Sequence, residues 1–327
     1  LLSYAGGEFT QNSLSVSFRG INGAFKKAWY FGDTSWNLGG TARTLDGVDG
    51  GCPLEDGIMS RRNMAVLDDS RSLVLAEDGW VDVRDDNSVD VYIFGYRDRY
   101  FDALKAYYKL TGYTPLIPRY ALGNWWSRYY KYTQEEYQNL INKFKENEIP
   151  FSVAVMDMDW HYTEIDSEYG SGWTGFSWNK DLFPDHRKFL DFLHNEGMEV
   201  TLNLHPAEGI SSLEDNYKEA AQKLNIESGD TIEFDIADPK FVETYFENIL
   251  SPLEKEGVSF WWMDWQQGNT SRIKGLDPLW MLNHFHYVHM SNSSKRPMVF
   301  SRYAGPGSHR YPIGFSGDTK MTWDALD

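Results

Sequence analysis

This 327-residue sequence has a single cysteine and few basic residues relative to acidic ones. Cys52 is the only cysteine, which excludes an internal disulfide framework and a cysteine-based zinc site. Lys and Arg number 31 against 48 Asp and Glu, the formal net charge is −17, and the basic residues form no cluster. Repulsion from phosphate therefore argues against nucleic acid as a partner.

Long apolar runs and a recognisable leader are also lacking. No stretch of 18 apolar residues occurs, so we expect no transmembrane helix and no membrane partner. The sequence begins Leu-Leu-Ser-Tyr-Ala-Gly-Gly, without an initiator methionine or the charged and apolar regions of a signal peptide. A single cysteine fits the cytoplasm without requiring it, so localisation stays open between the cytoplasm and secretion.

Aromatic residues, by contrast, are abundant. They make up 16% of the chain and include 13 Trp and 20 Tyr. Aromatic side chains stack on flat ligands, and sugar rings offer such faces. A large core uses the same residue types, so composition alone leaves carbohydrate binding and core packing as alternatives.

The length and the pattern along the chain predict two domains, one of about 100 residues and one of about 200. The first third consists of short alternating runs broken by Gly, Asp and Asn, which predicts an N-terminal antiparallel β-sandwich over 1–115. Within it, residues 83–94 resemble a hairpin with its turn at Asp85-Asp86-Asn87. A Pro-rich connector ending at Pro118 separates this part from a second domain over 116–327.

The second domain alternates strands with helices, which predicts parallel β/α units. Expected strands cover residues 120–126, 151–156, 198–204, 257–262, 297–301 and 312–315. Thr133 and Glu136 form a capping box that opens a helix, and Asp238-Pro239 is a second strong helix start. Six such units predict an incomplete (β/α)₈ TIM barrel, an α/β fold, truncated before strands seven and eight.

Barrel enzymes gather reactive groups at the C-terminal ends of their strands, so the residues that follow each apolar run are the informative ones. They are Trp126, Asp157, Asp159, His205, Asp264, Arg302 and Asp318. A carboxylate directly after a buried strand is costly unless it is hydrogen-bonded or used in chemistry. The alternative for Asp264 is a buried Asp that ties down a loop, and for Asp318 it is the N-cap of the next helix.

Asp264 and Asp318 together, set among tryptophans with no metal site evident, predict cleavage of a glycosidic bond through an oxocarbenium-like transition state and without a cofactor. One carboxylate attacks the anomeric carbon, and the other donates a proton to the leaving oxygen and later accepts one from water. Trp262 and Trp265 shield Asp264 from water, so we assign it as the nucleophile. Asp318, in a turn of small residues, is the general acid/base.

The remaining strand-end residues are candidates for substrate binding. Asp157 and Asp159 are two apart on what we expect to be an extended segment, where they share a face and can accept hydrogen bonds from sugar hydroxyls. A metal-binding or salt-bridge role is the alternative. Arg302 can hold hydroxyls or orient a carboxylate, with structural pairing as the alternative. His205 can bind a hydroxyl or serve as a structural hydrogen-bonding group.

With these residues identified, the chain resembles glycoside hydrolase family 31, the family of α-glucosidases and α-xylosidases. Trp261-Trp-Met-Asp264 is similar to the family's nucleophile strand, and Ser316-Gly-Asp318 is similar to its acid/base turn. The resemblance implies that Asp157 binds substrate, that Arg302 contacts the sugar in subsite −1, and that Trp262 lines the same pocket.

Two departures from the family pattern bear on sugar specificity. The first is Trp265-Gln-Gln-Gly268 after the nucleophile, which is similar to the segment of a branch of the family that acts on α-N-acetylgalactosaminides. The second is His205, which stands before proline where the family usually has a carboxylate. The expected function is a retaining exo-α-glycosidase, α-glucosidase-like, that hydrolyses terminal α-linked sugars of oligosaccharides or glycosides through a covalent glycosyl-aspartate. An α-N-acetylgalactosaminidase, an α-galactosidase, a transglycosylase and a non-catalytic carbohydrate-binding protein stay open, as do linkage and oligomeric state.

Overall fold

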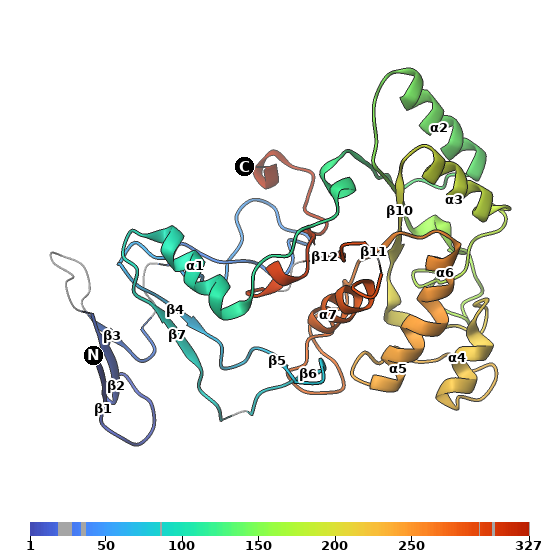
Figure 1. The fold of residues 1–327 in the computed structure, drawn as a ribbon. Coiled ribbons are helices and arrows are strands. Elements are labelled where there is room, and N and C mark those ends of the chain that lie inside the picture. Colours follow the sequence, from blue (N-terminus) through green and yellow to red (C-terminus); the bar gives the residue numbers. More distant parts are fainter. Residues whose placement is uncertain (19–27, 34–36, 86, 294, 303–304, 327) are drawn as a thin grey trace. The chain divides into compact units, whose positions relative to one another are not determined.

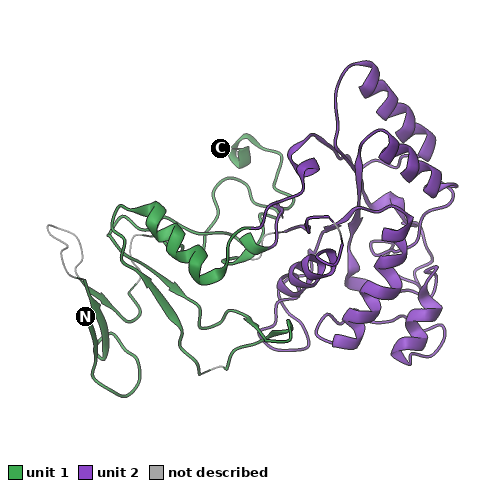
Figure 2. Ribbon diagram, in the orientation of Figure 1, with its two compact units in different colours: residues 1–114, 303–310, 316–327 green, residues 115–302, 311–315 purple. Residues whose placement is uncertain are grey.

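The computed structural model describes residues 1–18, 28–33, 37–85, 87–293, 295–302 and 305–326. The chain forms two compact units (Figure 2). Unit 1 comprises residues 1–114, 303–310 and 316–327, and unit 2 comprises residues 115–302 and 311–315. Segments from both ends of the chain therefore contribute to unit 1.

Unit 1 contains three small antiparallel sheets among its described residues (Figure 1). The first joins β1 (Leu2–Tyr4), β2 (Leu14–Ser17) and β3 (Ala28–Tyr30); the second joins β4 (Ala65–Asp68) to β7 (Val91–Phe94); the third joins β5 (Val74–Leu75) to β6 (Val81–Asp82). These sheets match the antiparallel character predicted for this region and form only part of a sandwich. Helices α1 (Tyr100–Thr111) and α8 (Trp323–Leu326) complete the unit.

Two expectations for this region are wrong. Residues 83–94 do not form a hairpin, because β7 pairs with β4 and β6 pairs with β5. Arg84 shows why the chain diverges here: its guanidinium bridges Asp69 at 2.7 Å and Asp90 at 3.2 Å, which joins segments far apart in sequence. Asp86, in the expected turn, lies outside the described residues. The last part of the region expected to be a β-sandwich over 1–115 instead forms helix α1.

Unit 2 is built on a six-stranded parallel sheet in which each strand lies beside the one that precedes it in sequence. Its strands are β8 (Trp125–Trp126), β9 (Val153–Met156), β10 (Glu199–Leu204), β11 (Phe260–Met263), β12 (Phe300–Arg302) and β13 (Gly314–Phe315). Consecutive neighbours are the order of a (β/α) barrel, whereas a doubly wound sheet reverses direction midway. The first strand is shorter than expected, since Arg119–Leu122 forms a 3₁₀ turn.

Helices connect the strands from β8 to β12, and local capping explains where several begin. They are α2 (Gln134–Glu146), α3 (His186–Asn195), α4 (Tyr217–Leu224), α5 (Pro239–Thr244), α6 (Ser251–Glu256) and α7 (Pro278–Met290), with a π-helical segment at Tyr245–Leu250 between α5 and α6. The capping box before α2 is confirmed: Thr133 Oγ1 accepts from Glu136 N–H at 3.2 Å, and Glu136 accepts from Thr133 N–H at 2.8 Å. Helix α4 was not anticipated.

The alternation of strand side chains places the candidate site on the core face of the sheet. Val153 and Val155 on β9 and Phe260 and Trp262 on β11 belong to one buried cluster. Trp261 points away from it, because its indole N–H donates to Glu254 on α6 at 2.8 Å. Asp264 follows Phe260 and Trp262 in the same alternation, so it lies on the core face just beyond the C-terminal end of β11.

Candidate active site

Asp264 is fixed at the end of β11 by backbone and side-chain bonds. Its N–H donates to the Leu204 carbonyl at 2.9 Å, so the pairing of β10 with β11 continues through it. Arg302 at the end of β12 donates from Nε to Asp264 Oδ1 at 2.7 Å and also places Nη2 against the same oxygen. His205 after β10 brings Nε2 to 3.2 Å from Oδ2. Three neighbouring strand ends therefore converge on one carboxylate.

The surroundings of Asp264 keep it ionised. Burial, with only 5% of the residue exposed, disfavours the charged form and by itself raises the pKa. The hydrogen bond and charge of His205 and the charge of Arg302 outweigh burial, so the net pKa of Asp264 lies below its ordinary value. A carboxylate that is buried, charged and oriented has the properties that a nucleophile needs.

The pKa of Asp157 is shifted in the opposite direction. Burial raises its pKa and is the largest influence; the Met158 N–H hydrogen bond and His205 lower it by less, and the charges of Asp264 and Asp159 add the smallest increases. Its Oδ1 accepts from Met158 N–H at 2.8 Å, which caps a 3₁₀ turn over Met158–Trp160. A carboxyl group with a raised pKa next to an ionised one holds a proton more readily than Asp264 does.

The expectation that Asp157 and Asp159 lie along an extended segment is wrong. The chain enters the 3₁₀ turn immediately after Asp157, which disrupts the two-residue alternation of a strand. Asp159 instead accepts a hydrogen bond from the Thr163 hydroxyl at 3.0 Å. The two carboxylates therefore have different neighbours. Asp157 lies close to His205 and Asp264, whereas Asp159 is hydrogen-bonded to Thr163.

His205 links Asp264 to an aromatic residue that the sequence did not single out. The imidazole is buried, and the Trp173 ring meets it edge to face at a centroid distance of 5.1 Å. Its Nδ1 has no hydrogen-bond partner among the described residues. The Thr174 hydroxyl donates to the His205 carbonyl, so the loop after β9 is attached to the end of β10.

Both tryptophans near the candidate nucleophile are buried. Trp262 packs against Phe300 at 5.6 Å and Phe315 at 5.3 Å, within the core below Asp264. Trp265 follows Asp264 directly, donates from its indole N–H to the Gly268 carbonyl at 2.8 Å, and packs against Phe234. Trp265 therefore fixes the loop that leaves the site, and Trp262 fills the layer beneath it.

Asp318 belongs to unit 1 rather than to the sheet of unit 2. The segment from Ser316 to Asp318 runs beside Leu45–Gly47, and Asp318 N–H donates to Asp46 Oδ1 at 2.8 Å. Asp318 is not the N-cap of the following helix, because α8 begins at Trp323 and Thr322 Oγ1 accepts from Ala325 N–H. Unit 2 thus brings together Asp157, His205, Asp264 and Arg302, and Asp318 is anchored in unit 1.

Metal binding and membrane insertion were the two other possibilities to consider for the described residues. No group of three or more His, Cys, Asp or Glu side chains among them is arranged to hold a metal ion. The helices in the described part of the chain are too short or too polar to cross a membrane.

The chain belongs to glycosyl hydrolase family 31, because the model of that family's TIM-barrel domain matches residues 114–327. An α-xylosidase of Saccharolobus solfataricus is 26% identical over 73% of this chain and 34% of its own length. An α-xylosidase of Emericella nidulans is 23% identical over 69% of the chain and 31% of its own length. The chain therefore spans about a third of the length of these curated relatives.

Solved structures of the family share the fold. A family 31 α-glucosidase from Bacteroides thetaiotaomicron superposes with a TM-score of 0.62 and 19% identity, covering 88% of this chain and 54% of that one. An α-xylosidase from a soil metagenome, complexed with xylose, gives a TM-score of 0.61 and 17% identity over 89% of this chain and 47% of that one. At such identities the likeness carries the fold alone.

Proposed function

We propose that the protein is a retaining exo-α-glycosidase that hydrolyses terminal α-linked sugars of oligosaccharides or glycosides. The observation that carries this proposal is the arrangement at Asp264, a buried carboxylate held ionised by Arg302 and His205 at the ends of three parallel strands. Membership of a family whose curated relatives are named α-xylosidase and α-glucosidase supports it.

The mechanism is a double displacement. Asp264 Oδ attacks the anomeric carbon while the glycosidic bond breaks, which forms a glycosyl-aspartate and inverts the configuration. Asp318 gives its proton to the leaving oxygen, then takes a proton from the water that attacks the same carbon from the other face. The second inversion restores the α configuration and releases Asp264 as a carboxylate.

The other strand-end residues serve substrate binding in this proposal. Asp157, whose raised pKa favours a proton, can donate or accept a hydrogen bond at a sugar hydroxyl. Arg302 and His205 hold Asp264, and Trp262 and Trp265 keep water from it. Asp159 acts further out, beside Thr163. The division into an N-terminal domain over 1–115 and a catalytic barrel over 116–327 is part of the same proposal.

We propose xylose or glucose as the terminal sugar, since the relatives are named α-xylosidase and α-glucosidase. The test compares the full-length protein with its Asp264→Ala variant on p-nitrophenyl α-glycosides of xylose, glucose, galactose and N-acetylgalactosamine. We expect turnover of one substrate and its loss in the variant. Turnover that survives Asp264→Ala, or no turnover of any of the four, would contradict the proposal.

The role of Asp318 has a separate test. An Asp318→Ala variant should still form the glycosyl-aspartate from an aryl glycoside whose leaving group needs no proton, but should resolve it slowly. Added azide, which needs no general base, should then restore turnover and give the α-glycosyl azide. A β-glycosyl azide would assign Asp318 as the nucleophile instead.

A further inference from the structure

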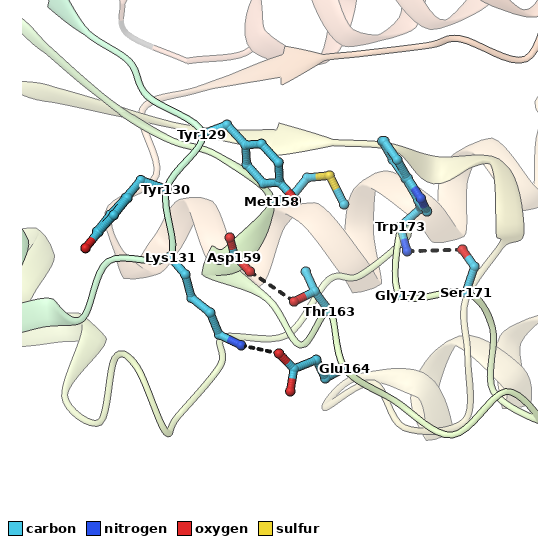
Figure 3. Close-up of a pocket in the computed structure, with 10 residues that line it drawn as sticks. All are labelled: Tyr129, Tyr130, Lys131, Met158, Asp159, Thr163, Glu164, Ser171, Gly172 and Trp173. Atoms are coloured by element: carbon cyan, nitrogen blue, oxygen red, sulfur yellow. Dashed lines mark hydrogen bonds and ion pairs between the residues drawn. The ribbon is translucent and has the colours of Figure 1, made fainter.

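Two groups of polar side chains in unit 2, both outside the immediate surroundings of Asp264, differ in how firmly they are held. The first lines an open pocket of about 510 Å³ among the loops after β8 and β9 (Figure 3). There Lys131 pairs with Glu164 at 2.6 Å, with side chains 45% and 86% exposed, and Glu208 accepts from Ser171 N–H at 2.9 Å. These contacts join one loop to another, and an ion pair so exposed contributes little to stability.

The second group surrounds Glu254 on α6 and contacts the nucleophile strand from the helix side. Glu254 Oε1 accepts from the indole N–H of Trp261 on β11 at 2.8 Å, and His289 Nε2, in the last turn of α7, lies 2.9 Å from both carboxylate oxygens. Trp261 is fully buried, and the side chains of Glu254 and His289 are only 21% and 20% exposed. One carboxylate therefore joins the helix before β11, β11 itself and the helix after it (Figure 1).

Aromatic packing holds His289 against this carboxylate. The Phe246 ring, in the π-helical segment before α6, is stacked on the imidazole at a centroid distance of 4.7 Å and an interplanar angle of 27°. Phe246 also meets His286, one turn earlier on α7, at 4.9 Å. Burial, and then the charge of His289, lowers the pKa of His286 to about 3, so His286 adds no charge here at neutral pH. A carboxylate only accepts hydrogen bonds, so His289 Nε2 is the donor to Glu254.

Helix α7 also contacts the other member of the reacting pair. Asn283 on α7 is buried, and its Nδ2 donates to the Arg302 carbonyl at 3.4 Å. Arg302 Nε in turn donates to Asp264 Oδ1 at 2.7 Å. Glu254 is therefore linked to Asp264 through β11 and to Arg302 through α7, so it touches both elements whose relative position sets this ion pair.

We propose that Glu254 is a positioning residue for the glycosidase reaction: by joining Trp261 to His289, it holds Asp264 in register with Arg302. The inference rests on the proposed function and adds to it a residue that acts through its neighbours. Register matters because a displacement of about 1 Å at a reacting group can cost about 100-fold in rate.

The test compares two carboxylates of α6 in the full-length protein. Glu256 is the matched control, because its side chain is 20% exposed and pairs with His186 at 3.1 Å and Arg187 at 2.7 Å, both on α3. With the preferred aryl α-glycoside, Glu254→Ala should lower kcat about 10-fold or more and leave KM within about 2-fold, since the substrate contacts stay in place. Glu256→Ala should leave both constants within about 2-fold.

Two further variants separate positioning from folding. Glu254→Gln keeps an oxygen that accepts from the Trp261 N–H and should restore kcat to within about 3-fold of the wild type. Trp261→Phe removes that N–H and keeps a ring, so it should lower kcat by about as much as Glu254→Ala, and the double variant should lose no more than either alone. Thermal unfolding checks that each variant is folded at the assay temperature. If Glu254→Ala does not fold, Trp261→Phe decides.

Equal losses of kcat in Glu254→Ala and Glu256→Ala, an unchanged kcat in Trp261→Phe, or a loss carried by KM would overturn the positioning role. A wild type that turns over none of the aryl glycosides defeats the proposed function instead, and crystal structures of the full-length proteins then decide. A separation of Arg302 Nε from Asp264 Oδ1 that lengthens in Glu254→Ala and stays unchanged in Glu256→Ala supports the register role. The same separation in all three proteins overturns it.

Discussion

Two carboxylates of unit 2, one buried and one half-buried, have pKa values shifted in opposite directions. Asp264, at the end of β11, has Arg302 and His205 as partners, and its pKa is lowered. Glu214, in the loop after β10, accepts from the Ser177 hydroxyl at 2.5 Å and Phe176 N–H at 3.1 Å, and burial raises its pKa to about 7. Loss of solvent by itself raises the pKa of both carboxyls, so the partners decide the direction of the net shift.

The contrast separates a chemical role from a structural one. Asp264 is held as an anion where a nucleophile is needed. Glu214 joins the loop after β9 to the loop after β10 through neutral donors, a task that a protonated carboxyl also performs. We therefore expect substitutions that remove charge, and keep shape, to have very different effects at the two positions.

The largest effect should come from that matched pair of substitutions. Asp264→Asn should lower kcat more than about 1,000-fold, because an amide does not attack the anomeric carbon. Glu214→Gln, the same change at the half-buried carboxylate, should leave kcat within about 3-fold. Steady-state kinetics on the preferred aryl α-glycoside measures both, and a comparable loss in the two variants would break the comparison.

A smaller effect should follow from removing a cation from Asp264. Arg302→Met keeps the length of the side chain but removes its charge, so the pKa of Asp264 should rise from its lowered value. A higher pKa means that Asp264 takes up its proton at a higher pH, and the acidic limb of the kcat/KM profile should move upward by about one unit or more.

Arg187 provides the control for this shift, since its exposed guanidinium pairs with Glu256 at 2.7 Å. Arg187→Met should leave the pH profile unchanged. An acidic limb that stays in place in Arg302→Met would show that Arg302 does not set the ionisation of Asp264.

The smallest effect concerns stability at Glu214. A carboxyl whose folded pKa is raised favours folding in its protonated form, so it destabilises the protein as pH rises from about 4.5 to about 7. Glu214→Gln stays neutral and should raise the free energy of unfolding at pH 8 by about 1–2 kcal/mol, with little change at pH 4. Urea titrations at the two pH values measure it, and an equal gain at both would point to packing instead of ionisation.

The sequence predicted the sheet of unit 2 better than the structure of unit 1. In unit 2, long apolar runs and strong caps such as Thr133 and Asp238 identify elements locally. In unit 1 the strands have two to four residues each, and Arg84 bonds to carboxylates from other segments. Pairings of that kind depend on distant residues, which local alternation does not reveal.

The candidate site shows the same division. Strand ends pointed to Asp264, Arg302, His205 and Asp157, because polar residues directly after apolar runs stand out. Trp173 and Glu208 lie in loops whose positions follow from hydrogen bonds to other loops, so no periodic pattern marks them. A tryptophan between Gly172 and Thr174 in a polar stretch was the one available signal.

The most direct test of the account is to trap the covalent intermediate on Asp264. The full-length protein is incubated with a ring-fluorinated glycosyl fluoride of its preferred sugar, which slows breakdown of the glycosyl-enzyme, and its peptides are then analysed by mass spectrometry. The account predicts one added fluoroglycosyl group on the peptide that contains Asp264, and none in Asp264→Asn. A label on Asp157, Asp318 or any other residue would contradict it.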